Sequence, residues 1–172
     1  SKDEEAGKCF GGSARLAKAV AMRRAALDAE GSPSLLVDGG DQFQGSLFYT
    51  TYKGKAAAEL MNAIGYDAMT VGNHEFDDGP QVLRGFINAV DFPSLMSNAD
   101  LSKEPSLARV LKPYTIVEKG GQRIGIIGAT PPDTPELSSP GPNIRFIKPE
   151  SALRYTVAEL EADGVDKIVL LS

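Results

Sequence analysis

The stretch AMTVGNHEFD, residues 68–77, joins an apolar segment directly to a polar turn. Its first four residues are mainly apolar, which is typical of a short buried strand. The turn that follows carries Asn73 and His74, and His74 is the only histidine in the sequence. An amide oxygen beside an imidazole can hold a hard metal ion next to a group that donates a proton. The stretch therefore predicts a buried strand with a polar site at its end.

A second stretch, LLVDGGDQFQG at residues 35–45, has the same arrangement, with Asp41 in its glycine-rich turn. Along the rest of the chain, expected helices alternate with short apolar strands. This alternation predicts an α/β fold with a mostly parallel sheet that is buried on both faces. Ligand sites in such sheets lie beyond the carboxyl ends of the strands. Asp41, Asn73 and His74 are therefore expected at one edge of the sheet.

Local signals predict the remaining elements. Helices are expected at about 14–29 and 55–64, after Gly79-Pro80 to about residue 90, and at 150–162. Strands are expected at 34–38, 68–71, 92–97 and 167–171, and a hairpin of residues 114–118 and 122–128 around Gly120-Gly121. Residues 1–12 and 130–142 are expected to be loops. Ser13 is the expected N-cap of the first helix, whose expected buried stripe is Leu16, Ala19, Val20 and Leu27.

Composition narrows the class of protein. The 172 residues are enough for one domain with its own core. The formal net charge of −5 argues against general nucleic-acid binding, which usually needs a basic surface. No apolar run approaches the roughly 20 residues that span a bilayer, and no leader peptide is recognisable within the chain. Cys9 is the only cysteine, so we expect a free thiol or a partner outside this chain.

Asp41 is the best candidate for a metal-bridging ligand. A carboxylate has two oxygens and can link two cations, and the preceding Gly39 and Gly40 let the backbone approach closely. The alternative is an Asx-turn after the strand. Asn73 offers a neutral oxygen ligand, and its alternative is a turn residue in the left-handed conformation.

His74 is expected either to bind metal or to donate a proton. The alternative is a hydrogen-bonded histidine of the core or of a turn. Asp77, three residues later, can accept a hydrogen bond from a ring nitrogen of His74 and so fix its tautomer. Its alternative is the N-cap of the next helix, a role for which Asp78 competes. Glu75 is expected to be structural.

Three further polar residues have less specific expectations. Asp38 is expected to be a turn carboxylate that follows the first strand, and the alternative is a residue that supports the site's ligands. Asn98 ends another predicted strand and is expected to be a structural turn residue, and the alternative is a residue that faces the site. Arg15 is expected either to meet an anion or to cap local carbonyl groups.

Several blocks of the sequence resemble a known family. Gly40-Asp41 and Gly72-Asn73-His74-Glu75 look like two signature blocks of the calcineurin-like metallophosphatases. Other blocks are similar to the 5′-nucleotidases, and to the ecto-5′-nucleotidase branch in particular: residues 9–16 (CFGGSARL), 36–46 (LVDGGDQFQGS), 52–54 (YKG), 65–69 (GYDAM) and 137–141 (LSSPG). The blocks occur in order and cover essentially the whole chain.

The resemblance implies a four-layer α-β-β-α sandwich with mixed, largely parallel sheets, and a hydrolase that uses two divalent metal ions, Zn, Mn or Mg. By position, Asp41 would bridge the two metals and Asn73 would bind one of them. His74 and Asp77 would form the catalytic dyad, and Asn73 and His74 would lie near the phosphate of a nucleotide substrate such as AMP. The family resemblance also implies export to the periplasm or cell surface.

The sequence departs from the family pattern in ways that limit these expectations. The family's Asp-x-His block, which normally precedes the Gly-Gly-x-Ala-Arg segment, does not occur here. Two later histidine blocks and the C-terminal domain that recognises the nucleoside are also absent. Residues 1–172 are therefore expected to form a partial metallophosphatase catalytic domain, inactive or nearly so by itself.

For the intact protein, the resemblance implies release of phosphate from nucleoside 5′-monophosphates. Other nucleotide hydrolases of the family are alternatives, namely 2′,3′-cyclic phosphodiesterase, apyrase and UDP-sugar hydrolase. A second class of function is a non-catalytic binding module on the same scaffold. The joint presence of Asp41, Asn73, His74 and Asp77 favours the enzyme.

Overall fold

The computed structural model describes residues 2–8 and 10–172. The chain divides into two compact units, residues 1–34 and residues 35–172. The expectations for Cys9 lie outside the described residues. Within residues 2–8 and 10–172, no helix combines the length and the apolar character that crossing a membrane requires.

The first unit contains two helices, α1 (Lys2–Glu5) and α2 (Ser13–Ala29). The prediction of a loop over residues 1–12 is therefore wrong at α1. Ser13 is the first residue of α2 and Gly12 occupies the N-cap position without a side-chain hydrogen bond, so the predicted N-cap is also wrong. The predicted buried stripe is wrong as well, since no side chain of α2 is buried and Leu16 is 48% exposed. Many residues of α2 are alanines, which have little apolar surface to bury.

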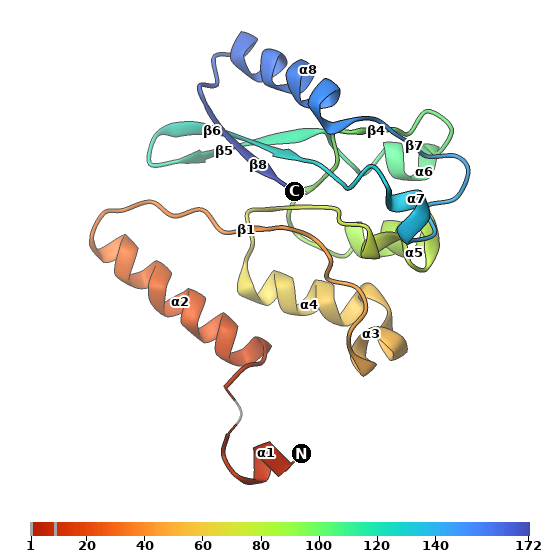
Figure 1. The fold of residues 1–172 in the computed structure, drawn as a ribbon. Helices are drawn as coiled ribbons and strands as arrows, with labels where there is room; N and C mark the ends of the chain where they lie inside the picture. The colour runs from red at the N-terminus through yellow and green to blue at the C-terminus, as the bar shows by residue number, and fades with distance from the viewer. Residues whose placement is uncertain (1, 9) are drawn as a thin grey trace. The chain divides into compact units, whose positions relative to one another are not determined.

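The second unit begins with a parallel three-stranded sheet. Its strands β1 (Val37–Asp38), β2 (Ala68–Thr70) and β3 (Ser94–Leu95) follow the order β1-β2-β3. Helices α3 (Leu47–Tyr52) and α4 (Gly54–Ile64) connect β1 to β2, and α5 (Gly79–Ile87) connects β2 to β3 (Figure 1). The three strands predicted in these regions are present but shorter. The helix predicted to end at Ile64 does so, and Gly65 closes it in the left-handed conformation at φ 80°.

The second sheet contains β5 (Tyr114–Lys119), β6 (Gln122–Gly128) and β8 (Lys167–Leu171). β5 and β6 are antiparallel, whereas β6 and β8 are parallel. The predicted hairpin is confirmed, and Gly120 and Gly121 make its two-residue turn with φ values of 56° and 71°. The predicted final helix and strand are confirmed as α8 (Pro149–Ala162) and β8.

Several short elements lie in segments for which no element was predicted. β4 (Ala99–Asp100) and β7 (Arg145–Phe146) form an antiparallel pair. The helices α6 (Pro105–Ala108) and α7 (Thr134–Leu137) are one turn long, and α7 interrupts the loop expected at 130–142. A 3₁₀ turn, η1 (His74–Phe76), follows β2. Elements of two to four residues have too few positions for a periodic apolar pattern.

Three apolar clusters arrange the second unit in four layers. Met69 of β2 packs with Leu83 and Phe86 of α5 on one face of the first sheet. Between the sheets lies a cluster from β2, β3, β6 and β8, made of Ala68, Leu95, Ile126 and Leu171. On the outer face of the second sheet, Ile127 packs with Leu160 of α8. The order helix, sheet, sheet, helix confirms the predicted α-β-β-α sandwich.

The contact between the two sheets predicts a specific effect on stability. A Cβ atom at Gly128 would lie 2.6 Å from the backbone oxygen of Leu95. Gly128→Ala is therefore expected to lower the free energy of unfolding by about 1–3 kcal/mol, because overpacking forces the backbone to shift. Urea unfolding followed by circular dichroism measures this change.

Gly85→Ala is the matched control, because a Cβ at this exposed position of α5 would meet nothing within 4 Å. This substitution is expected to be neutral or to stabilise by about 0.5–1 kcal/mol through helix propensity. Equal losses of stability in the two variants would contradict the close contact at Gly128.

Candidate functional site

Two loops, residues 39–45 and 71–77, leave the same edge of the first sheet. Parallel pairing of Asp38 with Met69 brings the carboxyl ends of β1 and β2 together. Gly40 has a φ of 87°, and a Cβ atom there would lie 2.6 Å from the backbone nitrogen of Gly72. A Cβ atom at Gly72 would overlap the carboxylate of Asp41. The two loops therefore touch through backbone atoms at positions where only glycine fits.

Asp41 lies at this contact with its side chain exposed. Its Oδ1 accepts a hydrogen bond from the backbone N–H of His74 at 3.0 Å. The Asx-turn considered for Asp41 belongs instead to Asp38, whose Oδ1 accepts the N–H of Gly40 at 2.9 Å. Asp38 is thus the predicted turn carboxylate, and the Asp41 side chain is directed at the neighbouring turn that carries His74.

Asn73 is half-buried and follows β2 closely. Its φ of −74° and ψ of −35° are right-handed, so the alternative of a left-handed turn residue is wrong. Among residues 2–8 and 10–172, the side-chain amide of Asn73 has no hydrogen-bond partner. Its oxygen is therefore available as a ligand, and Asn73 directly precedes His74, whose backbone N–H binds Asp41.

His74 and Asp77 form a hydrogen-bonded pair, with 2.8 Å between His74 Nδ1 and Asp77 Oδ2. The hydrogen bond that the His74 ring makes to the carboxylate of Asp77 raises the pKa of His74 above its usual value. Burial acts to raise the pKa of Asp77, but hydrogen bonds from Ser138 and His74 outweigh it and hold that pKa below its usual value. The expected hydrogen bond is present, and the structure favours a protonated imidazole beside an ionised carboxylate.

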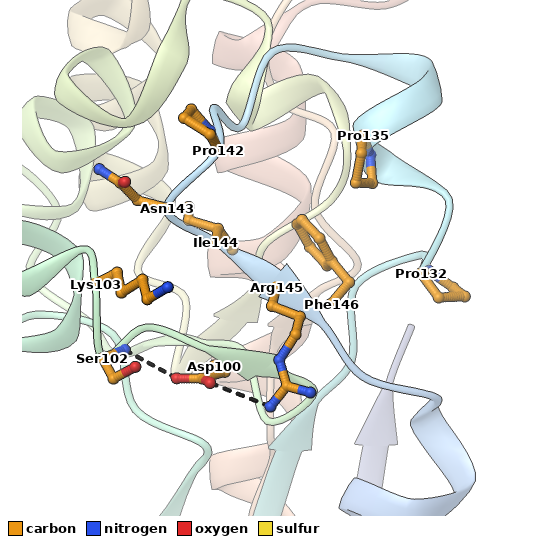
Figure 2. A pocket seen from close by; sticks show the side chains of 10 residues that line it. All are labelled: Asp100, Ser102, Lys103, Pro132, Pro135, Pro142, Asn143, Ile144, Arg145 and Phe146. Carbon is orange, nitrogen blue, oxygen red and sulfur yellow. Dashed lines mark hydrogen bonds and ion pairs between the residues drawn. The ribbon is translucent and has the colours of Figure 1, made fainter.

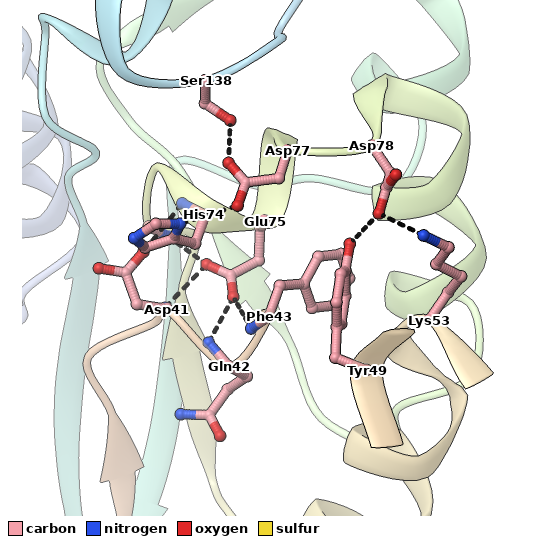
Figure 3. Close-up of polar contacts among 11 residues, drawn as sticks. Asp41, Gln42, Phe43, Tyr49, Lys53, His74, Glu75, Asp77, Asp78 and Ser138 are labelled. Atoms are coloured by element: carbon pink, nitrogen blue, oxygen red, sulfur yellow. Dashed lines mark hydrogen bonds and ion pairs between the residues drawn. The ribbon is translucent and has the colours of Figure 1, made fainter. Parts of the chain in front are cut away.

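The helix-capping role considered for Asp77 is wrong. Asp78 occupies the N-cap position of α5, although its side chain makes no capping hydrogen bond. Asp78 Oδ2 instead accepts hydrogen bonds from Tyr49 Oη at 2.5 Å and Lys53 Nζ at 3.0 Å. The two adjacent aspartates therefore face different partners, and only Asp77 contacts His74 (Figure 3).

Ser138 is a site residue that the sequence reasoning did not single out. Its Oγ donates a hydrogen bond to Asp77 Oδ1 at 2.6 Å, across 61 residues of sequence. Ser138 lies in the block of residues 137–141, which is part of the family resemblance. Membership of that block is the sequence feature that could have identified Ser138. Ser138 restrains the carboxylate that in turn orients the imidazole.

Glu75 is fully buried at the centre of the site. Its carboxylate accepts the backbone N–H groups of Asp41, Gln42 and Phe43 from one loop and of Gly72 from the other (Figure 3). Burial raises the pKa of Glu75, and the N–H donors oppose this shift in part. The expectation that Glu75 is structural agrees with these contacts.

Two other polar residues make structural contacts. Asn98 is fully buried and exchanges hydrogen bonds with the backbone of Thr130, which agrees with the expected structural role. Arg15 donates to the carbonyl oxygen of Gly11 at 2.9 Å, which is the local capping considered for it.

The chemistry of the donors fits a divalent metal ion. Asp41 and Asn73 present the carboxylate and amide oxygens that hard cations prefer. Within the described part of the chain, no group of three or more histidine, cysteine or acidic side chains could hold a metal ion. These residues can therefore contribute to a metal site without completing one.

A separate hollow of about 490 Å³ lies along β4 and β7 (Figure 2). Lys103 and three prolines contribute to its wall. Its arginine, Arg145, donates to Asp100 Oδ2 at 3.2 Å. The described residues that line this hollow include none of the predicted site residues, so it adds nothing to the site.

A family model described as calcineurin-like phosphoesterase matches residues 9–168 of the chain. The 5′-nucleotidase of Bos taurus is 42% identical over 176 residues, which cover 99% of this chain and 30% of the bovine protein. The chain thus spans about 30% of the length of this relative.

Two solved structures have the same fold over a similar share of their length. The 5′-nucleotidase precursor from Thermus thermophilus superposes with a TM-score of 0.88 at 43% identity, over 94% of this chain and 31% of that one. The NAD nucleotidase of Haemophilus influenzae superposes with a TM-score of 0.82 at 34% identity, over 93% of this chain and 31% of that one.

Because His74 is the only histidine, NMR can report on the pair directly. The pKa of His74 is expected to exceed the usual value of about 6.5 and to fall towards it in Asp77→Asn. A folded-state pKa above the unfolded one means that the stabilising contribution is complete below about pH 6.5 and is lost as the pH rises through the folded value. The ring proton shifts of the 172-residue chain against pH give the measurement.

Asp78→Asn is the matched control, because Asp78 pairs with Tyr49 and Lys53. It is expected to leave the pKa of His74 nearly unchanged. Equal falls in the two variants would show that general negative charge, and not the Asp77 hydrogen bond, raises the pKa.

Proposed function

The chain belongs to the calcineurin-like phosphoesterase family, and on that premise we propose that the protein carrying it is a metal-dependent 5′-nucleotidase. It would release phosphate from nucleoside 5′-monophosphates. The observation that carries this proposal is the meeting of Asp41 with the His74–Asp77 pair at one edge of the sheet. An oxygen ligand for metal and an oriented proton donor are thereby adjacent.

We propose that Asp41 and Asn73 hold part of a site for two divalent metal ions, Zn, Mn or Mg. When bound, the ions would supply a Lewis acid and an activated water for attack on phosphorus. Asp41 would bridge the two ions, since both oxygens of a carboxylate can coordinate. Divalent metal ions are the cofactors of this family.

His74 would act on the substrate itself. Its Nδ1 is engaged by Asp77 at 2.8 Å, so Nε2 is the ring nitrogen that can reach a phosphate oxygen. A protonated Nε2 would stabilise charge on phosphate in the transition state and give a proton to the leaving ester oxygen. Asp77 would hold the tautomer and ring orientation, and Ser138 would hold Asp77.

The proposal of a nucleotide substrate rests on the names of similar proteins. The bovine and Thermus thermophilus proteins are named 5′-nucleotidases, and this chain covers about 30% of each. The name of the Haemophilus influenzae relative, NAD nucleotidase, supports hydrolysis of a dinucleotide as a second candidate. The description of the Thermus thermophilus protein as a precursor supports export of the present protein to the periplasm or cell surface.

The hydrogen-bonded pair argues against a binding module that has lost its chemistry. A binding surface has no need of an imidazole oriented by a carboxylate that a serine 61 residues away also restrains. The joint presence of four candidate residues, Asp41, Asn73, His74 and Asp77, also supports the enzyme.

His74→Ala tests the proposed activity. In the full-length protein, phosphate release from 5′-AMP after chelation and addition of Mn²⁺, Zn²⁺ or Mg²⁺ is expected to depend on metal. The variant is expected to lose about 10²–10⁴-fold in kcat, the usual contribution of a general acid. Asp166→Asn is the control, because the ion pair of Asp166 with Lys167 is exposed and involves none of the proposed site residues.

Wild-type protein that is folded and metal-loaded but hydrolyses no nucleotide would reject the proposal. Release of AMP from NAD without release of phosphate from AMP would favour the second candidate. An active His74→Ala variant would remove His74 from the mechanism.

We also propose that residues 1–172 are part of a larger catalytic domain, since two oxygen ligands do not hold two metal ions tightly. The 172-residue chain alone is expected to bind Mn²⁺ with a Kd on the order of 10⁻⁴ M or weaker, because affinity for hard cations depends on the number of charged ligands. It is expected to release almost no phosphate from 5′-AMP. Calorimetric titration and a phosphate assay measure both, and robust activity of this chain would contradict the proposal.

A further inference from the structure

The side chain of Glu75 joins the two loops of the site. Its Oε1 accepts the N–H groups of Gln42 at 2.6 Å and Phe43 at 3.3 Å. Its Oε2 accepts the N–H groups of Asp41 at 2.9 Å and Gly72 at 2.7 Å. Oε2 therefore binds a residue from each loop, and one carboxylate satisfies four backbone donors.

The loop that Glu75 binds has a backbone conformation that needs support. Asp41 has a φ of 57°, in the left-handed region that side chains with a Cβ atom rarely adopt. Such a conformation persists only where surrounding contacts determine it. Three consecutive N–H groups, from residues 41 to 43, converge on the carboxylate, and successive N–H groups of this kind form a concave site for an anion.

The same contacts hold the loop that carries Asp41 against the turn that carries Asn73. Glu75 follows Asn73 by two residues and is anchored in the η1 turn. The Asp41 carboxylate lies against Gly72 and accepts the N–H of His74 at 3.0 Å. A change at Glu75 would release the Asp41 loop from the turn that carries Asn73 and His74.

We propose that Glu75 is a positioning residue that sets metal affinity by holding Asp41 against the Asn73–His74 turn, without touching metal or substrate. This inference rests on the proposed function, because it takes Asp41 as a metal ligand. Glutamine has the same shape, but its NH₂ group would face N–H donors in place of an acceptor. Aspartate keeps the charge but is shorter by one methylene, so it cannot reach both loops.

The experiment compares wild type, Glu75→Gln and Glu75→Asp in the full-length protein. The Kd for Mn²⁺ is measured without substrate by competition with a metallochromic chelator. Both variants are expected to bind Mn²⁺ about 10- to 100-fold more weakly, as for other residues that orient a metal ligand. With 5′-AMP, kcat is expected to fall while KM changes little. Where Glu75→Gln does not fold, Glu75→Asp supplies the comparison.

Leu160→Ala is the matched control for lost stability, because Leu160 is fully buried under the second sheet and packs with Ile127 and Val165. It is expected to lower the unfolding midpoint and to leave the Kd for Mn²⁺ unchanged. A wild-type Kd and kcat in the folded Glu75 variants would overturn the inference, and so would an equal rise of Kd in Leu160→Ala. Metal binding without phosphate release in the wild type counts against the proposed function alone, because the affinity comparison needs no substrate.

Discussion

The loops after β1 and β2 approach so closely that a Cβ atom at Gly40 would clash with the backbone of Gly72, and one at Gly72 would clash with Asp41. This approach is possible because β1 and β2 are parallel neighbours, so their carboxyl ends leave the sheet side by side. It brings N–H groups from both loops to one buried place, where they need an acceptor. The Glu75 carboxylate meets that need, and the position of Asp41 beside His74 follows from the same packing.

The second sheet contributes to this site through the way it packs on the first. The hydroxyl of Thr130, a residue that lies just after β6, donates to the carbonyl oxygen of Val71 at 2.6 Å. The backbone N–H of Thr130 donates to Asn98 Oδ1 at 2.8 Å. These buried hydrogen bonds fix Thr130, at the start of the segment that contains Ser138. Ser138 then reaches Asp77 from this segment. The layer arrangement thus connects a loop after β6 with a turn after β2.

Local signals in the sequence were enough to predict the ends of those helices and strands that a glycine terminates. Gly65 ends α4, and Gly120-Gly121 turns β5 into β6, because each needs a positive φ that glycine adopts at little cost. The pair β4–β7 and the Ser138–Asp77 hydrogen bond were not predictable in this way. Each joins segments that are 45 or more residues apart, and nothing local to either segment specifies its partner.

Within the site, the sequence indicated that Asp41 and His74 would lie together and that Asp77 would bind His74, but it did not indicate the backbone conformations. Asn73, which tolerates a left-handed backbone, is right-handed, whereas Asp41 is left-handed. The packing of the two loops, and not the conformational preference of each residue type, therefore determines these backbone conformations. The same packing gives each neighbouring carboxylate its own hydrogen-bond partners. Glu75 accepts hydrogen bonds from backbone N–H groups, Asp77 binds Ser138 and His74, and Asp78 binds Tyr49 and Lys53. Among the described residues, no lysine or arginine forms an ion pair with the exposed carboxylate of Asp41, which suits the metal-binding role proposed for it.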